Sequence, residues 1–304
     1  MNEYKVVMLC TADTVRNIEK YLSIWKELLK PKAVVIIGSK AVGKWLEEER
    51  VEVEFKNEDE LYPGMTFQHV KDRIRYRTDN PAAVERTGWY FQQFLKMAYS
   101  MQCKEESYLV WDADTVPTHS VEMTDKTGRY YFDIKTEYNK AYFDTLSRLF
   151  PQLKKKNTYS YIAEHMLFHA EIMRELISAI EGNDAVEGKD FWEKILHAVA
   201  VKDIPNSGFS EFETYGTYVE YYHADAYRTR KWKSLREGTV FFGTGITRGQ
   251  MEYLRKEYDA VSFEQHAMHQ KMARLLSRKP FQRLWFIRLF EGIKSKAGWL
   301  KGKI

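Results

Sequence analysis

Short apolar runs alternate with helical patterns over the first sixty residues of the chain. Strands are predicted at residues 4–10, 33–37 and 51–55, and helices between them at 14–29 and 40–50. Thr14 or Asp13 is expected to cap the first helix, and Pro31 ends its pattern. This β-α-β-α-β order predicts the parallel half-sheet of an α/β fold of the nucleotide-binding type.

The next strong apolar run, Leu109 to Trp111, stops abruptly at two acids, Asp112 and Asp114. Side chains at positions i and i+2 of an extended chain point the same way, towards the edge where open α/β sheets bind ligands. Two carboxylates held together suit a divalent cation, which can in turn hold a diphosphate. An Asp-x-Asp triplet also arises by chance, and acids often occupy the turn after a strand, so the triplet alone decides nothing.

The stretch before this run is divided into two parts. Residues 62–84 are polar and broken by Pro63-Gly64 and Asn80-Pro81, which predicts an irregular connection. Residues 85–101 return to a helical pattern and carry Gln93 and Lys96, which we expect to help position a ligand near the two acids. The chain shows neither Gly-x-Gly-x-x-Gly nor a Walker loop, so a phosphate ligand needs another holder, and a metal on the Asp pair is the candidate.

A second informative block is Ser210-Glu-Phe-Glu-Thr-Tyr-Gly216. Ser210 and Glu213 have the spacing of a capping box, which leaves Glu211 as the free acid and our candidate general base. The alternative is that both acids only cap the helix. Elsewhere the pattern predicts further strands at 129–134 and 239–242 and helices at 141–150, 171–180 and 190–199.

Other candidate site residues come from strand ends and polar clusters. Thr11, Asp13 and Asn57 follow predicted strands and are expected to line a nucleotide pocket, while Glu164, His165 and Tyr215 are expected to line the part of the site that binds a second substrate, the acceptor. A histidine in an apolar run is more often a satisfied core residue, and a tyrosine is common in half-buried helices. His266, with His269 as the alternative, is the expected third metal ligand beside Asp114 and Asp112. Asp114 is expected to be the stronger ligand of the two, with Asp112 on the ribose or on the metal through water.

Composition separates a body from a tail. The 304 residues are 44% hydrophobic, ample for a core, and the two cysteines form no C-x-x-C pair, which fits a reducing cytoplasm. Ten Lys or Arg and the single acid Glu291 lie among aromatic residues in 271–304. This composition is typical of an interfacial helix on an anionic membrane, and a helix docked on the body is the alternative. Nucleic acid is not expected as a partner.

Three blocks carry a resemblance to a known family. Gly88-Trp-Tyr-Phe-Gln-Gln-Phe-Leu-Lys96, Tyr108-Leu-Val-Trp-Asp-Ala-Asp114 and Phe209-Ser-Glu-Phe-Glu-Thr-Tyr-Gly216 are similar to bacterial sugar transferases with the glycosyltransferase-A fold, in a group linked to surface-polysaccharide assembly. The resemblance implies a nucleoside diphosphate sugar donor, UDP-sugar foremost, bound through Mn²⁺ or Mg²⁺, and a saccharide or lipid-linked acceptor. It implies a catalytic domain at 1–270, with a nucleotide half at 1–117 and an acceptor half at 118–270, and a basic helical tail at 271–304.

Two other functions fit parts of the pattern. A metal-dependent phosphoesterase or nuclease also uses acids at strand ends with histidines. A non-catalytic module on a membrane surface is the interpretation if the basic tail is the functional part. We expect the protein to be an inverting glycosyltransferase. We expect it to lie in the cytoplasm or to attach peripherally to the inner face of the cell membrane.

Overall fold

The computed structural model describes residues 3–243, 245–263 and 276–301. The chain divides into two compact units: unit 1 comprises residues 1–113 and 122–232, and unit 2 comprises residues 114–121 and 233–304. The boundary between 113 and 114 puts the two acids of the Asp-x-Asp triplet in different units.

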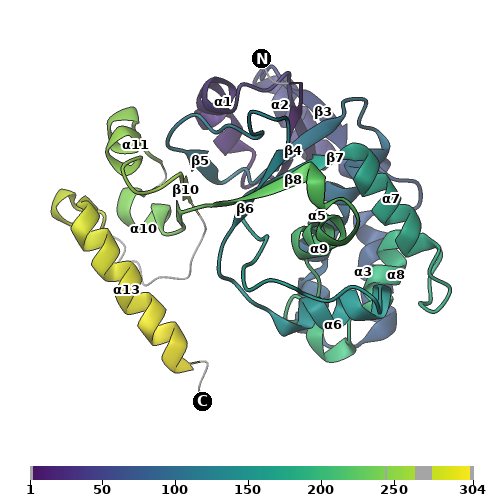
Figure 1. Ribbon diagram of the computed structural model, residues 1–304. Helices are drawn as coiled ribbons and strands as arrows, with labels where there is room; N and C mark the ends of the chain where they lie inside the picture. The colour runs from purple at the N-terminus through teal and green to yellow at the C-terminus, as the bar shows by residue number, and fades with distance from the viewer. Residues whose placement is uncertain (1–2, 244, 264–275, 302–304) are drawn as a thin grey trace. The chain divides into compact units, whose positions relative to one another are not determined.

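Unit 1 contains a five-stranded sheet in the order β3-β2-β1-β4-β7, of which β3, β4 and β7 are labelled in Figure 1. Its strands are β1 (Lys5–Cys10), β2 (Val34–Gly38), β3 (Glu54–Asn57), β4 (Ser107–Trp111) and β7 (His165–His169). All pairs are parallel except β4 with β7, in which Trp111 lies opposite His165. Every residue of β2 and β4 is buried, as expected for strands covered on both faces. The predicted α/β class with a mostly parallel sheet flanked by helices is confirmed.

The helices of unit 1 connect and cover these strands. They are α1 (Arg16–Leu29), α2 (Lys40–Glu48), α3 (Phe67–Arg77), α4 (Pro81–Glu85), α5 (Thr87–Ala98), α6 (Lys140–Leu149), α7 (Ala170–Glu181), α8 (Phe191–Ala198) and α9 (Glu211–Tyr222). The prediction of an irregular connection at 62–84 is wrong, because α3 and α4 occupy most of it. Only Val70 and Ile74 of α3 are buried, so its apolar stripe is too narrow to stand out in a polar sequence.

A small second sheet of unit 1 joins β6 (Tyr130–Ile134) to β8 (Tyr227–Lys231) in parallel. Its register sets Asp133 directly opposite Arg230. The two side chains form a bidentate pair, with Nε to Oδ1 and Nη2 to Oδ2 both at 2.6 Å. Cross-strand opposite charges stabilise such a pairing.

Unit 2 has a three-stranded sheet in the order β5-β10-β9, made of β5 (Thr115–Pro117), β10 (Ala260–Ser262) and β9 (Ser234–Leu235). Its helices in the described residues include α10 (Gly238–Phe242), α11 (Arg248–Leu254) and α13 (Leu284–Lys301). The prediction of a strand at 239–242 is wrong, since these residues form α10. The run Thr-Val-Phe-Phe has β-type composition, but it is only one helical turn long, too short for periodicity to decide.

The long helix α13, at the yellow end of the chain in Figure 1, occupies residues 284–301 of the predicted tail. Its Ile287 is fully buried, Phe290 packs edge-on against Phe241 at a centroid distance of 5.4 Å, and Glu291 accepts a hydrogen bond of 2.6 Å from the Tyr258 hydroxyl. Trp285, Leu289 and Ile293 are exposed by 59%, 52% and 61%. None of the helices described is long and apolar enough to cross a membrane.

Candidate active site

The candidate site begins at the place where the chain changes direction within the sheet. From β1 the chain moves outward through β2 to β3, and it then returns to add β4 on the other side of β1. The carboxyl ends of β1 and β4 therefore flank a topological switch point, where open α/β sheets bind their ligands. Asp112 directly follows β4. The Asn17 amide group of α1 donates to the Ala113 carbonyl at 3.2 Å, which joins the segments after β1 and β4.

A buried lysine connects two acids at this edge. The Lys96 Nζ lies 3.0 Å from Glu211 Oε1 and 3.4 Å from Asp112 Oδ1. The side chains of Lys96 and Glu211 are only 12% and 5% exposed, whereas that of Asp112 is 41% exposed. Each of the three residues is a separate candidate from the sequence, and the structure brings them together.

The electrostatics of the cluster follow from its partial burial. Burial alone would lower the pKa of Lys96, but the carboxylates of Asp112 and Glu211 raise it above its ordinary value. The two carboxylates thus favour the charged form of Lys96. Loss of hydration raises the pKa of Asp112, Lys96 opposes this, and the nearby Glu164 carboxylate adds to it, with a net upward direction. The exposed Asp112 carboxylate remains the member of the cluster that can meet a ligand.

The Gln93 side chain lies near this cluster and contacts the backbone of Glu211. Its Oε1 accepts a hydrogen bond of 3.0 Å from the Glu211 amide, and the residue is buried. The helices α5 and α9, which carry the two residues, lie side by side (Figure 1). Gln93 thus holds the start of α9.

The predicted roles of Glu211 and Glu213 in helix capping need correction. The Ser210 hydroxyl accepts from the Glu213 amide at 3.2 Å, as predicted, but Glu213 does not bond back to Ser210. Its Oε1 accepts instead from the Ser160 hydroxyl at 2.5 Å and the Tyr161 amide at 3.2 Å. Glu211 is not a free acid, because Lys96 holds it. Contacts between residues so far apart in the chain cannot be predicted from the local sequence pattern.

A second buried network lies beside Asp112, whose amide donates to the Glu164 carbonyl at 2.9 Å. The Glu164 carboxylate binds Lys135 and accepts from the Trp232 indole at 3.0 Å. His165 stacks on Trp111 at a centroid distance of 4.5 Å. Glu164 and His165 are 6% and 2% exposed, so both are buried beside Asp112.

His165 also reaches the cross-strand pair of the small sheet. Its Nε2 lies 2.8 Å from Asp133 Oδ2, and Asp133 is held by Arg230 on its other side. Burial raises the pKa of Asp133, but the hydrogen bonds from Arg230 and His165 outweigh it and set a net lowered pKa. Asp133 and Arg230 are not among the residues predicted from the sequence. The sequence offered one weak indication of this pair, because Asp133 and Arg230 are charged residues within the strand segments 130–134 and 227–231.

Other predicted residues are not brought to this cluster. Tyr215 is fully buried, with its hydroxyl 2.7 Å from that of Tyr227 and 3.0 Å from the His169 amide, so its surroundings are those of a core residue. Asn57 ends the edge strand β3 and caps the following turn by accepting from the Asp59 amide.

The turn after β1 also differs from the prediction. Thr11 and Thr14 close it through the Thr11 amide and the Thr14 hydroxyl at 2.9 Å, and α1 begins without a side-chain cap. The expected capping by Thr14 or Asp13 is therefore wrong. Thr11 and Asp13 are exposed at this turn, after β1.

The remaining predicted metal ligands are Asp114 and His266. In unit 2 the Asp114 carbonyl accepts from the Phe263 amide at 2.8 Å, and its carboxylate accepts from the Thr115 hydroxyl at 3.2 Å. His266 and the alternative His269 lie outside the described residues. Within the ranges that the structure describes, no group of three or more His, Cys, Asp and Glu is arranged to hold a metal ion.

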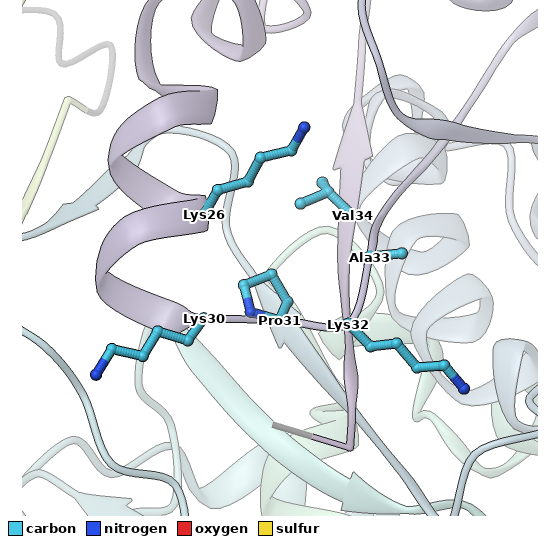
Figure 2. A pocket seen from close by; sticks show the side chains of 6 residues that line it. All are labelled: Lys26, Lys30, Pro31, Lys32, Ala33 and Val34. Atoms are coloured by element: carbon cyan, nitrogen blue, oxygen red, sulfur yellow. The ribbon is translucent and has the colours of Figure 1, made fainter. Parts of the chain in front are cut away.

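A hollow at the opposite edge of the sheet does not compete with this site. It is lined by Lys26, Lys30, Pro31, Lys32, Ala33 and Val34, at the amino end of β2. Figure 2 shows the three lysine side chains pointing away from one another. Lys26 donates to the Glu52 carbonyl at 3.2 Å and Lys32 to the Glu105 carboxylate at 3.1 Å. The amines do not converge on a common ligand.

Comparisons with known proteins give one family and several distant structures. The sequence profile of a family described as "Family of unknown function (DUF6492)" matches residues 2–238. No curated protein matches the chain in sequence.

Two of the solved structures that resemble the chain are glycosyltransferases by their names. Mouse xyloside xylosyltransferase 1 in its apo form is 11% identical over 85% of this chain and 97% of its own, with a TM-score of 0.40. Core-mannan synthase A from Aspergillus fumigatus in its Mn/GDP form is 8% identical over 75% of this chain and 73% of its own, with a TM-score of 0.45. With TM-scores below 0.5 at these identities, the two likenesses establish neither a substrate nor an activity for this chain.

Proposed function

The chain belongs to the DUF6492 family, and we propose that it is a metal-dependent glycosyltransferase of the glycosyltransferase-A type. It moves a sugar from a nucleoside diphosphate sugar to a saccharide or lipid-linked acceptor in surface-polysaccharide synthesis. The observation that carries the proposal is the Lys96, Asp112 and Glu211 cluster at the carboxyl end of β4, beside the topological switch point.

Donor binding is assigned to the exposed side of this cluster. The sequence offers no glycine-rich phosphate loop, so a diphosphate here requires a cation. The Asp112 carboxylate is 41% exposed and is a hard oxygen ligand of the kind that Mn²⁺ and Mg²⁺ prefer. We assign the metal to Asp112 and Asp114 with His266 as the third ligand; when bound, the metal would neutralise charge on the departing diphosphate. Thr11 and Asp13 are assigned to the nucleotide.

Glu211 is assigned to the acceptor hydroxyl. In transfer with inversion, the acceptor oxygen forms a bond to the anomeric carbon, the bond from that carbon to the diphosphate breaks, and a carboxylate takes the hydroxyl proton. Glu211 sits at the first residue of α9, and Lys96 fixes its carboxylate. Glu164 and His165 support this side of the site as buried wall residues.

The helix α13 is assigned to an anionic membrane surface on the cytoplasmic side. Trp285, Leu289 and Ile293 recur every four residues and form an exposed apolar stripe, while Ile287 anchors the helix to unit 2. The tail also carries ten basic residues. One face docks and another remains available for lipid, which supports peripheral attachment close to a lipid-linked acceptor.

The activity is tested by measuring nucleoside diphosphate release from a panel of nucleotide sugars with Mn²⁺ and a saccharide acceptor mixture. We expect acceptor-stimulated release with at least one donor, lost in Asp112→Asn and retained in Asp79→Asn, an exposed aspartate on the loop after α3. Equal release by wild type and Asp112→Asn would contradict the proposal.

A further inference from the structure

One face of α5 carries polar side chains that contact the segment preceding α9. Arg86 at the N-cap, Tyr90, Gln93 and Lys96 follow at intervals of four, three and three residues, so they share one side of the helix. Each of them forms a hydrogen bond or ion pair with a residue in 204–211. Lys96 contacts Asp112 and the Phe212 ring as well.

Each of these side chains binds a different part of that segment. The Arg86 guanidinium donates to the Ser207 hydroxyl. The Tyr90 hydroxyl accepts from the Gly208 amide at 2.9 Å and donates to the Ile204 carbonyl at 3.1 Å. Gln93 continues the series with the Glu211 amide, and Lys96 ends it on the Glu211 carboxylate.

The backbone of the held segment is in an unusual conformation. Ser207 has a φ of +61°, in the left-handed region that disfavours residues with a Cβ. A Cβ added to Gly208 would lie 2.4 Å from Val199 Cγ1, so only glycine fits there. Strained backbone of this kind persists where its surroundings over-determine it, and it gathers at functional sites.

The helix α6 and its N-cap residue also form hydrogen bonds with this segment. The Asn139 amide group donates to the Ser207 carbonyl at 3.3 Å, and the Thr145 hydroxyl donates to the Gly208 carbonyl at 2.7 Å. The segment is therefore tied on both its amide and carbonyl sides. Its conformation is set by side chains and not by regular secondary structure.

The consequence falls on Glu211, the first residue of α9. The amide of a first helical residue has no partner within its own helix, and here Gln93 supplies one. Gln93 and Lys96 lie about one turn apart on α5, so a single rigid helix fixes both the backbone and the carboxylate of Glu211.

We propose that Gln93 is a positioning residue that sets Glu211 for proton transfer, with Tyr90 and Arg86 holding the segment that leads to it. This inference rests on the proposed function and revises the sequence-based expectation that Gln93 positions a ligand, the donor, near the two acids. A donor contact and a positioning role differ in what they change: the first alters donor affinity, whereas the second alters the rate of the step that needs Glu211.

The test compares Gln93→Met, which removes the acceptor oxygen at similar side-chain length, with the matched Gln92→Met at the exposed neighbouring position. For Gln93→Met we expect kcat to fall roughly 10- to 100-fold, as for small misplacements of catalytic groups, with an unchanged donor Kd. Hydrogen exchange of the amides in 204–213 should accelerate. Gln93→Glu, which keeps the acceptor oxygen, should restore part of both losses, and Gln92→Met should match the wild type.

Tyr90→Phe provides a second variant that removes only the hydroxyl, in case Gln93→Met folds poorly. It should accelerate exchange at Gly208 and lower kcat less. Weaker donor binding with unchanged exchange in Gln93→Met would overturn the inference, as would an unchanged kcat. If the wild type transfers no sugar from any donor, the proposed function fails. Hydrogen exchange then still tests whether α5 holds the segment before α9. Unchanged exchange in both variants would overturn this part of the inference, and accelerated exchange would support it.

Discussion

The ammonium group of Lys96 and the carboxylate of Glu211 form a buried ion pair, with 3.0 Å between Nζ and Oε1. The pair joins α5 to the first residue of α9, and Asp112 adds a second carboxylate at 3.4 Å from the same ammonium. Lys96 therefore holds both carboxylates in place at the end of β4 before any ligand binds.

Removal of the shared cation should destabilise the protein. Lys96→Met leaves Glu211 buried without a counter-charge, and loss of one partner of such a pair costs about 3–5 kcal/mol. Urea denaturation measures the free energy of unfolding. The double variant Lys96→Met with Glu211→Gln should recover much of the loss, because it removes the unpaired charge. A loss below about 1 kcal/mol in the single variant would show that the pair is not sealed from water.

Asp133 should make stability depend on pH in the acid range. Its pKa is lowered in the folded protein, so below the ordinary aspartate pKa of about 4 the unfolded chain takes up a proton more readily than the folded one. The stability from this group is present above that pH and is lost as the pH falls through the folded pKa. Asp133→Asn should be less stable near neutral pH and should lose less stability on acidification.

The matched control for Asp133 is Asp184→Asn, at an exposed position. Its unfolding free energy should follow that of the wild type between about pH 2 and 7, because the Asp184 side chain is exposed in the folded protein and stands outside the Asp133 network. An Asp133→Asn curve parallel to that of the wild type would contradict the assignment of the acid dependence to this network.

Gly216 of α9 should not tolerate a side chain. A Cβ there would lie 2.4 Å from the ring of the buried Tyr161, so Gly216→Ala should destabilise by about 1–3 kcal/mol despite the better helix propensity of alanine. Gly292→Ala in α13, where nothing lies within 4 Å, should be neutral or stabilising by up to about 1 kcal/mol. Thermal unfolding compares the two, and equal effects would be inconsistent with the packing of α9 on Tyr161.

Much of the central sheet could be predicted because its strands are buried on both faces. Uninterrupted apolar runs predicted β1, β2 and β4, and the acids that follow Trp111 lie directly after β4 as expected. The helix α3 was missed because two buried residues make too weak a pattern in a charged segment. The segment 239–242 was assigned to a strand because its composition is typical of strands. One turn of helix is too short to show the periodicity that would have indicated a helix.

The candidate site was predicted residue by residue but not as an arrangement. Lys96, Asp112 and Glu211 each had a local reason for selection, yet their ion pairs depend on the packing of α5 and α9 beside β4. Glu213 was assigned a local partner by its spacing, whereas the fold supplied Ser160 and Tyr161. Asp133 and Arg230 meet only through the register of β6 and β8, which a single sequence does not reveal.

The exposed stripe of α13 should determine attachment to anionic vesicles. Trp285→Ser with Leu289→Ser removes two apolar groups that are 59% and 52% exposed, so binding to vesicles rich in acidic lipid should weaken by at least about tenfold in co-sedimentation. Binding of wild type should also fall as salt rises, since basic residues contribute. Tyr76→Ser, at an aromatic residue 77% exposed on α3, is the control and should bind as wild type does. Unchanged binding by the double variant would exclude the stripe as the membrane surface.

The edge of the sheet beside Asp112 is proposed to bind a nucleoside diphosphate together with a divalent metal. Isothermal titration of the full chain with UDP, GDP, ADP and CDP, with and without Mn²⁺, measures this binding. We predict binding of at least one nucleotide that requires the metal and is at least about tenfold weaker in Asp112→Asn, with Asp79→Asn unchanged. Failure of every nucleotide to bind the wild type in the presence of Mn²⁺ or Mg²⁺, or equal binding by Asp112→Asn, would contradict the claim.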